Sequence, residues 1–171
     1  MDWNITAHRG LRVAMTVALA LGSSGCNRDF AGQVVGVVDG DTFDVMQDGQ
    51  RVRVRLWQVD APEFAQPFGS RARQALSRLV YERQAQVRFV ARDTQGHVVA
   101  QVTVDGRDIN HELVALGMAW TGPDTPPQTP LVALQQAARS ARVGLWEDPH
   151  PVPPWEWRDR QSGAMRTSGA P

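Results

Sequence analysis

Three carboxylates recur close together in the first half of the chain: Asp41 in "DGDT", and Asp60 and Glu63 in "VDAPE". The first motif has a plainer interpretation, because glycine accepts the positive φ of a tight turn and Asp-Gly pairs are common in hairpins. If the surrounding strands form a meander, however, Asp41 begins one strand and Asp60 follows the next, and antiparallel neighbours lie only ~5 Å apart. The three acidic side chains would then converge on one site.

A cluster of three carboxylates repels itself unless a cation neutralises it. Calcium and magnesium prefer ligand sets made of oxygen. The chain has one cysteine and no His-x-x-x-His pair, so zinc is not expected. The acidic residues therefore predict a site for a hard divalent cation.

The hydrophobic pattern predicts the elements that position these acids. From Gln33 the pattern is that of β-strands, up to the run "RVRVRLWQV", in which Val52, Val54 and Leu56 share one face and three arginines share the other. We predict a three-stranded antiparallel meander with one packed side. The spacing becomes helical from Ser70, the expected N-cap, and two strands follow, "QVRFVA" and "HVVAQVTV".

Two shorter helices complete the pattern. Asp108 should cap the first, which Gly117 ends, and Thr129 and Pro130 should open the second, which ends at Gly144. The predicted order is three strands, a helix, two strands and two helices. This is the layout of a five-stranded OB-fold barrel, an α+β fold that is mainly β and commonly binds oligonucleotides.

Both ends of the chain differ from the barrel pattern. Residues 1–26 join two arginines, a short apolar run and small residues up to Cys26, which is the layout of a secretory signal peptide, so we expect an exported protein, periplasmic or extracellular. The sequence leaves the fate of Cys26 open: it is acylated as in bacterial lipoproteins, or it is either discarded or carried passively. A lipid there would be the only expected membrane contact. Residues 149–171 are proline-rich and then polar, and we expect most of them to be extended or disordered. The barrel domain would then occupy residues 27–148.

The charge balance restricts the kind of partner. The 171 residues carry 18 basic and 18 acidic side chains, and every basic one is arginine. Overall neutrality argues against a protein that coats nucleic acid by bulk electrostatics. Guanidinium groups nevertheless bind phosphate through paired hydrogen bonds and stay charged when desolvated. We expect a monomer whose contact with a polyanion is local.

The ordered motifs resemble the staphylococcal nuclease family, also called thermonucleases. "DGDT", "RVRL", "VDAPE", a helix, a D-x-x-G segment and "GLW" follow one another from Gln33 to Trp157, and the ending "PPWEWR" is similar to bacterial members. The resemblance implies an OB barrel with three helices. It also implies a calcium-dependent endonuclease that hydrolyses DNA and RNA with little sequence specificity and leaves 3′-phosphate ends.

Carried over by position, the resemblance implies roles for individual residues. Asp41 and Asp60 would ligate Ca²⁺, together with the backbone carbonyl of Ala61. Glu63 would be the general base that activates the attacking water. Arg55 would bind the phosphate, where its planar donors match oxygens on which charge grows in the transition state.

The chain departs from the family pattern at position 97. The family's second phosphate-binding arginine follows the D-x-x-G segment, and this chain has His97 there. Loss of one donor to a transition-state oxyanion costs ~2.7 to 4 kcal/mol, or roughly 100- to 1000-fold in rate. A neutral imidazole supplies one hydrogen bond and no charged fork. His97 is therefore either a weaker substitute or a strand residue without a part in the site.

Other arginines and tryptophans have structural interpretations. Arg51 and Arg53 are expected on a solvated strand face, and Trp120 belongs with core packing. Trp155 and Trp157 either dock back onto the barrel or engage a partner, and the sequence does not choose between these two.

Two functions remain. The first is an exported calcium-dependent nuclease. The alternative is a catalytically impaired OB-fold module that binds nucleic acid or a protein at the cell envelope; His97 and the lack of the tyrosines that flank the nucleotide in the best-known family member support it. The acidic cluster weighs against this alternative, because a pure binding module gains nothing from carboxylates that repel one another.

Overall fold

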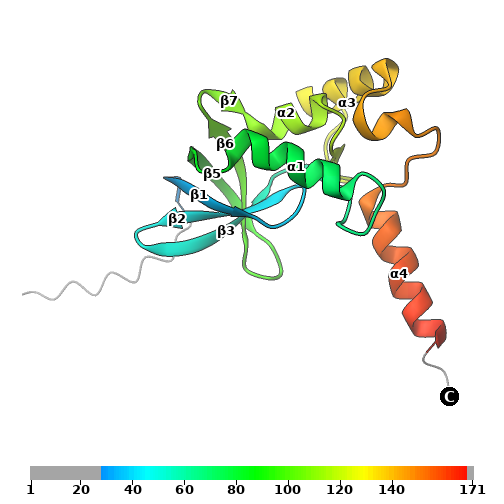
Figure 1. The fold of residues 1–171 in the computed structure, drawn as a ribbon, viewed down its shortest axis with the longest axis horizontal. Coiled ribbons are helices and arrows are strands. Elements are labelled where there is room, and N and C mark those ends of the chain that lie inside the picture. Colours follow the sequence, from blue (N-terminus) through cyan, green and yellow to red (C-terminus); the bar gives the residue numbers. More distant parts are fainter. Residues whose placement is uncertain (1–27, 169–171) are drawn as a thin grey trace, which may run out of the picture.

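A computed structural model of the protein describes residues 28–168 (Figure 1). Its strands are β1 (Phe30–Val37), β2 (Thr42–Gln47), β3 (Gln50–Leu56), β4 (Val59–Asp60), β5 (Gln84–Arg92), β6 (Val98–Val104), β7 (Arg107–Asp108) and β8 (Trp120–Thr121). Its helices are α1 (Gly69–Val80), α2 (Ile109–Ala115), α3 (Pro130–Ala141), the 3₁₀-helix η1 (Gly144–Glu147) and α4 (Pro154–Ser168).

The five long strands form a closed barrel. Antiparallel pairing runs in the order β3, β2, β1, β5, β6, and parallel pairing between β3 and β6 closes the ring. The predicted meander of β1 to β3 is confirmed, and so is the five-stranded OB-type barrel. The two-residue strand β7 pairs antiparallel with the end of β6, and β4 pairs with β8 in a separate two-stranded sheet.

Alternation along the strands separates the core from the outer surface. Val54 and Leu56 are buried with Phe43 and Val45, as the period of two requires. The opposite face of β3 carries Arg53, whose Nε lies 3.0 Å from a carboxylate oxygen of the buried Asp44. One side of α1 covers the core with small and aliphatic side chains, namely Ala72, Leu76, Leu79 and Val80.

The helix boundaries agree with the sequence in part. Asp108 caps α2, Gly117 follows that helix at a positive φ, and Thr129 precedes Pro130 at the start of α3, as predicted. Ser70 is not the N-cap of α1, because this helix begins at Gly69, whose lack of a side chain lets it pack against the carbonyl of Glu63. Close packing against the loop that precedes the helix, rather than a side-chain cap, thus sets this boundary.

The end of α3 also differs from the prediction. The helix stops at Ala141, and Arg142 takes the left-handed conformation with a φ of 52°. Gly144 instead opens η1, where its backbone packs against Gly117 too closely for a side chain. Gly144 is therefore needed where two loops pack closely together, and it does not terminate α3.

The expectation that most of residues 149–171 are extended or disordered is wrong, because Pro154–Ser168 form α4 (Figure 1). Pro154 stands at the first helical position, where its fixed φ suits a helix and its missing N–H is not needed. Trp155 packs edge-to-face on Trp120, with ring centroids 5.8 Å apart. Composition predicted disorder here, and this docking onto the folded domain overrides it.

Residues 1–26, the expected signal peptide with Cys26, lie outside the described part of the chain. Between residues 28 and 168, no helix has the length and apolar character needed to cross a membrane.

Candidate active site

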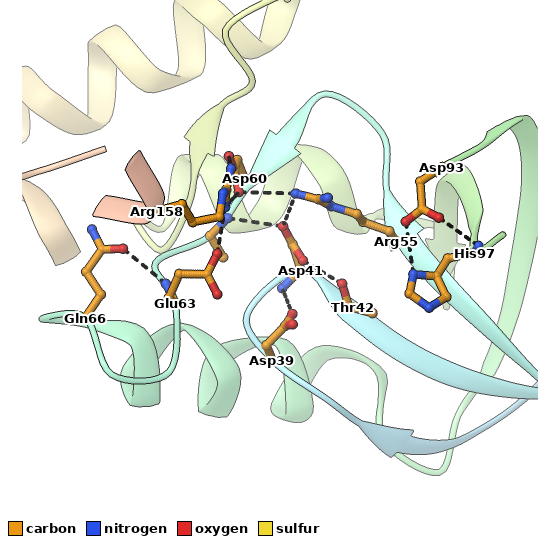
Figure 2. A network of polar contacts seen from close by, with 11 residues as sticks. Asp39, Asp41, Thr42, Arg55, Asp60, Glu63, Gln66, Asp93, His97 and Arg158 are labelled. Carbon is orange, nitrogen blue, oxygen red and sulfur yellow. Dashed lines mark hydrogen bonds and ion pairs between the residues drawn. The ribbon is translucent and has the colours of Figure 1, made fainter. Parts of the chain in front are cut away.

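The acidic motifs meet in a cleft of about 460 Å³ (Figure 2). The five residues to which the resemblance gives a role line this cleft, and so does His97; Asp39, Asp93 and Arg158 line it with them. The strand register explains the meeting: Thr42 pairs with Arg55 across β2 and β3, and the backbone N–H of Leu56 donates to the carbonyl of Asp41 at 3.0 Å. The start of one strand thereby faces the end of the next.

Asp41 is a buried carboxylate in an unfavourable environment. Only 5% of the residue is exposed, and Thr42 donates its hydroxyl to Oδ1 at 2.7 Å. Burial, followed by the nearby charge of Asp39, raises the pKa of Asp41 to about 8, although the charge of Arg55 and the Thr42 hydrogen bond act in the opposite direction. A cation beside this carboxylate would stabilise its charged form, and would thereby offset both the cost of burying the charge and the repulsion from Asp39.

Arg55 connects the two buried aspartates. Its Nη2 lies 3.3 Å from Oδ1 of Asp60 and 3.6 Å from Oδ2 of Asp41. The backbone N–H of Ala61 donates to the same Oδ2 of Asp41 at 3.3 Å, which holds this residue against the carboxylate. The structure therefore places Asp41, Asp60, Ala61 and Arg55 together; their roles as ligands and phosphate donor stay predictions.

Glu63 lies at the rim of the cleft, on the loop between β4 and α1. The side-chain oxygen of Gln66 accepts the backbone N–H of Glu63 at 3.1 Å, and the Gln66 backbone N–H donates to the Glu63 carbonyl at 2.8 Å. The side chain of Glu63 is 40% exposed, so that water reaches it. A carboxylate held by its backbone and open to solvent suits a general base.

His97 lines the cleft but is engaged elsewhere. Its Nδ1 lies 2.9 Å from Oδ2 of Asp93, and its backbone N–H donates to Oδ1 of the same carboxylate at 2.8 Å. Burial alone would raise the pKa of Asp93, but hydrogen bonds from His97 and Gln95 outweigh it and lower the pKa. Figure 2 shows the His97–Asp93 pair next to Arg55, on the side away from Glu63.

Arg158 is a residue of this cleft that the sequence analysis missed. It extends from α4 and makes ion pairs of 2.8 Å with Asp60 and 2.6 Å with Glu63 (Figure 2). These partners raise the pKa of Arg158, the hydrogen bond to Asp60 most of all. Pro154 at a helix start and the Glu156–Arg160 pair at helical spacing were the local signals that α4 exists.

Arg51 and Arg53 lie on the exposed face of β3, as expected. Both guanidinium groups pair with Asp44, at 3.6 Å and 3.0 Å. Trp120 and Trp146 stack edge-to-face with centroids 4.3 Å apart and belong to a buried cluster, in line with the core interpretation. Trp155 joins this cluster, which settles the choice left open for it in favour of docking onto the domain.

The family described as staphylococcal nuclease homologue matches residues 53–148. The chain belongs to this family. It is 41% identical over 172 residues to Protein ParB of Escherichia coli, covering 93% of this chain and 96% of the relative. It is 38% identical over 172 residues to a micrococcal nuclease of Shigella flexneri, covering 93% of this chain and 98% of that one. An uncharacterized endonuclease of Escherichia coli is 40% identical over 134 residues, 78% of this chain and 88% of the relative.

The site of this staphylococcal nuclease homologue suits a hard cation held by few protein ligands. Asp41 and Asp60 offer carboxylate oxygens within reach of one Arg55 nitrogen, and the pKa of Asp41 is raised first by burial and then by the charge of Asp39. Between residues 28 and 168, however, no three His, Cys, Asp or Glu side chains gather as a metal-binding group. A calcium ion would therefore need the carbonyl of Ala61, water and substrate to complete its shell, and it would have to displace Arg158 from Asp60.

Proposed function

We propose that the protein is an exported, calcium-dependent endonuclease that hydrolyses DNA and RNA with little sequence specificity and leaves 3′-phosphate ends. Membership of the staphylococcal nuclease family identifies a phosphodiester-hydrolysing enzyme. The observation that carries the proposal is the meeting of Arg55 with the buried carboxylates of Asp41 and Asp60, with Glu63 at the rim of the same cleft.

A bound calcium ion, held by Asp41, Asp60 and the carbonyl of Ala61, would neutralise the acidic cluster and polarise the phosphoryl group. Glu63 takes a proton from a water molecule as the water oxygen forms its bond to phosphorus. The bond from phosphorus to the 5′ oxygen breaks, this oxygen takes a proton from solvent and leaves as a 5′ hydroxyl, and the phosphate stays on the 3′ side. Arg55 turns its donors from the aspartates to the non-bridging oxygens, where negative charge develops.

The test uses the purified protein with plasmid DNA, single-stranded DNA and RNA. We expect cleavage with added calcium and none with a chelator, because the cleft carries too much negative charge to accept a phosphodiester unaided. Mass spectrometry of oligonucleotide products should find 3′-phosphate ends. Absence of calcium-stimulated cleavage over a wide range of pH and protein concentration would refute the proposal.

The alternative, an OB-fold module that binds without cleaving, is favoured by one observation: His97 is paired with Asp93 and offers no charged fork to a phosphate. An oligonucleotide titration separates the two functions. Binding that is indifferent to calcium and is followed by no hydrolysis would support the alternative.

The export proposal rests on residues 1–26 alone. Mass spectrometry of the mature N-terminus tests it, since a processed chain that begins at Cys26 with added lipid mass would identify a lipoprotein. A chain that keeps Met1 would argue against export.

A further inference from the structure

The contacts of Arg158 join residues that lie more than half the chain length apart in sequence. Nη1 lies 3.2 Å from Oδ1 of Asp60, Nη2 lies 2.8 Å from Oδ2, and these residues are 98 positions apart in sequence. Nη1 also lies 2.6 Å from Oε1 of Glu63. One planar guanidinium thus touches both a predicted metal ligand and the predicted base.

Arg55 and Arg158 reach the same oxygen. Nη2 of Arg55 lies 3.3 Å from Oδ1 of Asp60, and Nη1 of Arg158 lies 3.2 Å from it (Figure 2). Two guanidinium groups on different elements, β3 and α4, therefore converge where a phosphate bound at Asp60 would lie. Their planar forks match the non-bridging oxygens of a phosphodiester.

The charges around the cleft show why a second donor matters. Five carboxylates line it, those of Asp39, Asp41, Asp60, Glu63 and Asp93. Three guanidinium groups line it with them, and that of Arg53 is bound to Asp44 through two hydrogen bonds of 3.0 and 3.3 Å. Among the described residues that line the cleft, Arg55 and Arg158 are then the cations placed to receive an anionic substrate.

We propose that Arg158 is a second phosphate-binding residue of this site, supplied by α4. The proposal rests on the nuclease function proposed above. Asp60 would be a ligand of the cation, and Arg158 would then be released from that carboxylate and could turn its fork to a non-bridging oxygen of the bound phosphodiester. Its contact with Glu63 places it on the side of the phosphate from which the water attacks.

The attachment of α4 makes this donor preorganised. Trp155 stacks on Trp120 one turn before Arg158, with centroids 5.8 Å apart. Just before the helix, the carbonyl of Val152 accepts the side-chain amide of Gln66 at 2.6 Å. A fixed backbone reduces the freedom that an arginine loses when it binds, so its donors gain strength in the transition state.

The same contacts are also compatible with a different role for Arg158. Arg158 as a blocking group would hold Asp60 and Glu63 away from metal and substrate, and its removal would then raise activity. The two roles predict opposite signs, so one set of variants decides between them.

The variants are Arg158→Ala, Arg158→Lys and the control Arg160→Ala, which removes an exposed arginine of the same helix that pairs with Glu156 at 3.3 Å. We expect Arg158→Ala to lower kcat about 100-fold. Arg158→Lys should fall between it and the unchanged protein, because lysine keeps the charge and loses the fork. Arg160→Ala should match the unchanged protein.

The second measurement does not depend on cleavage. In a Glu63→Gln background with calcium, NMR titration compares a dinucleoside phosphate with its methylphosphonate analogue, which has the same shape and no charge. Arg158→Ala should weaken binding of the phosphate about tenfold, the value of a hydrogen bond to a charged group. It should leave binding of the methylphosphonate unchanged, which a loss of helix docking alone would not do.

Equal behaviour of Arg158→Ala and Arg160→Ala in both measurements would overturn the proposal, and so would faster cleavage by Arg158→Ala. Circular dichroism and the Tm confirm folding, and Arg158→Lys carries the test if the alanine variant does not fold. Should the unchanged protein not cleave while the phosphate selectivity still depends on Arg158, the nuclease function fails and the phosphate site stands. If the protein cleaves and the rate does not depend on Arg158, the nuclease function stands and the phosphate-binding role of Arg158 fails.

Discussion

Gln66 binds Glu63 by an amide oxygen that accepts the Glu63 backbone N–H at 3.1 Å. The same side chain donates its nitrogen to the carbonyl of Val152 at 2.6 Å, just before α4 begins. One buried amide, 6% exposed, therefore holds both the loop of the predicted base and the segment that leads to Arg158.

Replacing Gln66 with leucine should disturb both sides of this connection. Two partly buried backbone groups, the N–H of Glu63 and the carbonyl of Val152, lose their partners, which costs about 1 to 3 kcal/mol each where no water replaces the partner. We expect a lower Tm and roughly tenfold slower cleavage, because misplacement of catalytic groups by small distances lowers rates strongly. The control is Gln74→Leu on the exposed side of α1. If the two variants have the same kcat, Gln66 does not position the site.

Glu63→Gln removes the predicted base and keeps the shape of the side chain. A general base contributes about 100- to 10,000-fold, so kcat should fall by that range. Calcium affinity, measured by calorimetry, should change little, since Asp41 and Asp60 remain. Glu147→Gln, an exposed glutamate 3.5 Å from Arg71, is the control. A Glu63→Gln variant that retains most of its turnover would assign the base to another group.

The convergence of the acidic motifs could be predicted from the sequence, because the alternation of side chains along a strand and the pairing of consecutive strands depend on residues close together in the chain. Val54 and Leu56 point inward, so Arg55 must point outward, and the pairing of β2 with β3 brings it to Asp41. This inference needs only residues that are neighbours in sequence and the single hairpin formed by β2 and β3. The barrel followed from the same alternation of strands.

The contribution of α4 was not accessible in this way. Its composition is polar and proline-rich, and the contact between Asp60 and Arg158 spans 98 positions. Trp155 stabilises the helix by packing on Trp120 rather than by any local propensity. The end of α3 was misplaced for the same reason, since Gly144 packs against the distant backbone of Gly117, whereas Gly69 at the start of α1 packs against the nearby loop at Glu63.

Asp41 should make the stability of the calcium-free protein depend on pH. Its pKa is about 8 in the folded protein and near 3.8 when unfolded, so the folded state holds more protons between these values. The free energy of unfolding therefore falls as pH rises from about 4 to about 8, by at most about 1.4 kcal/mol per pH unit. Urea unfolding with a chelator measures this slope.

Asp41→Asn should reduce that slope and abolish stabilisation by calcium, because the amide neither titrates nor carries charge. Asp105→Asn, an exposed aspartate 2.9 Å from Arg83, provides the comparison. An unchanged slope in Asp41→Asn would show that another group causes it.

Gly69→Ala tests the close packing beneath the predicted base. A Cβ at this position would overlap the carbonyl oxygen of Glu63 and force the loop to move. We expect at least a tenfold loss of kcat, since catalytic geometry tolerates only small shifts. Gly36→Ala is the matched control, because the nearest atom to its Cβ would be 4.0 Å away. Equal rates for the two variants would mean that the loop adapts at no cost to the site.

His97→Arg tests whether position 97 can supply a donor to the substrate. The imidazole Nδ1 now lies 2.9 Å from Asp93, and an arginine has the length to keep this contact with one nitrogen and extend another into the cleft that both residues line. Turnover should rise several-fold in the unchanged protein. The rise should be larger in Arg158→Ala, because there the added guanidinium replaces a missing one, and a double-mutant cycle of kcat values measures the difference. If His97→Arg leaves the rate unchanged in both backgrounds, position 97 does not face the reacting phosphate, and His97 serves only to hold the turn after β5 through Asp93.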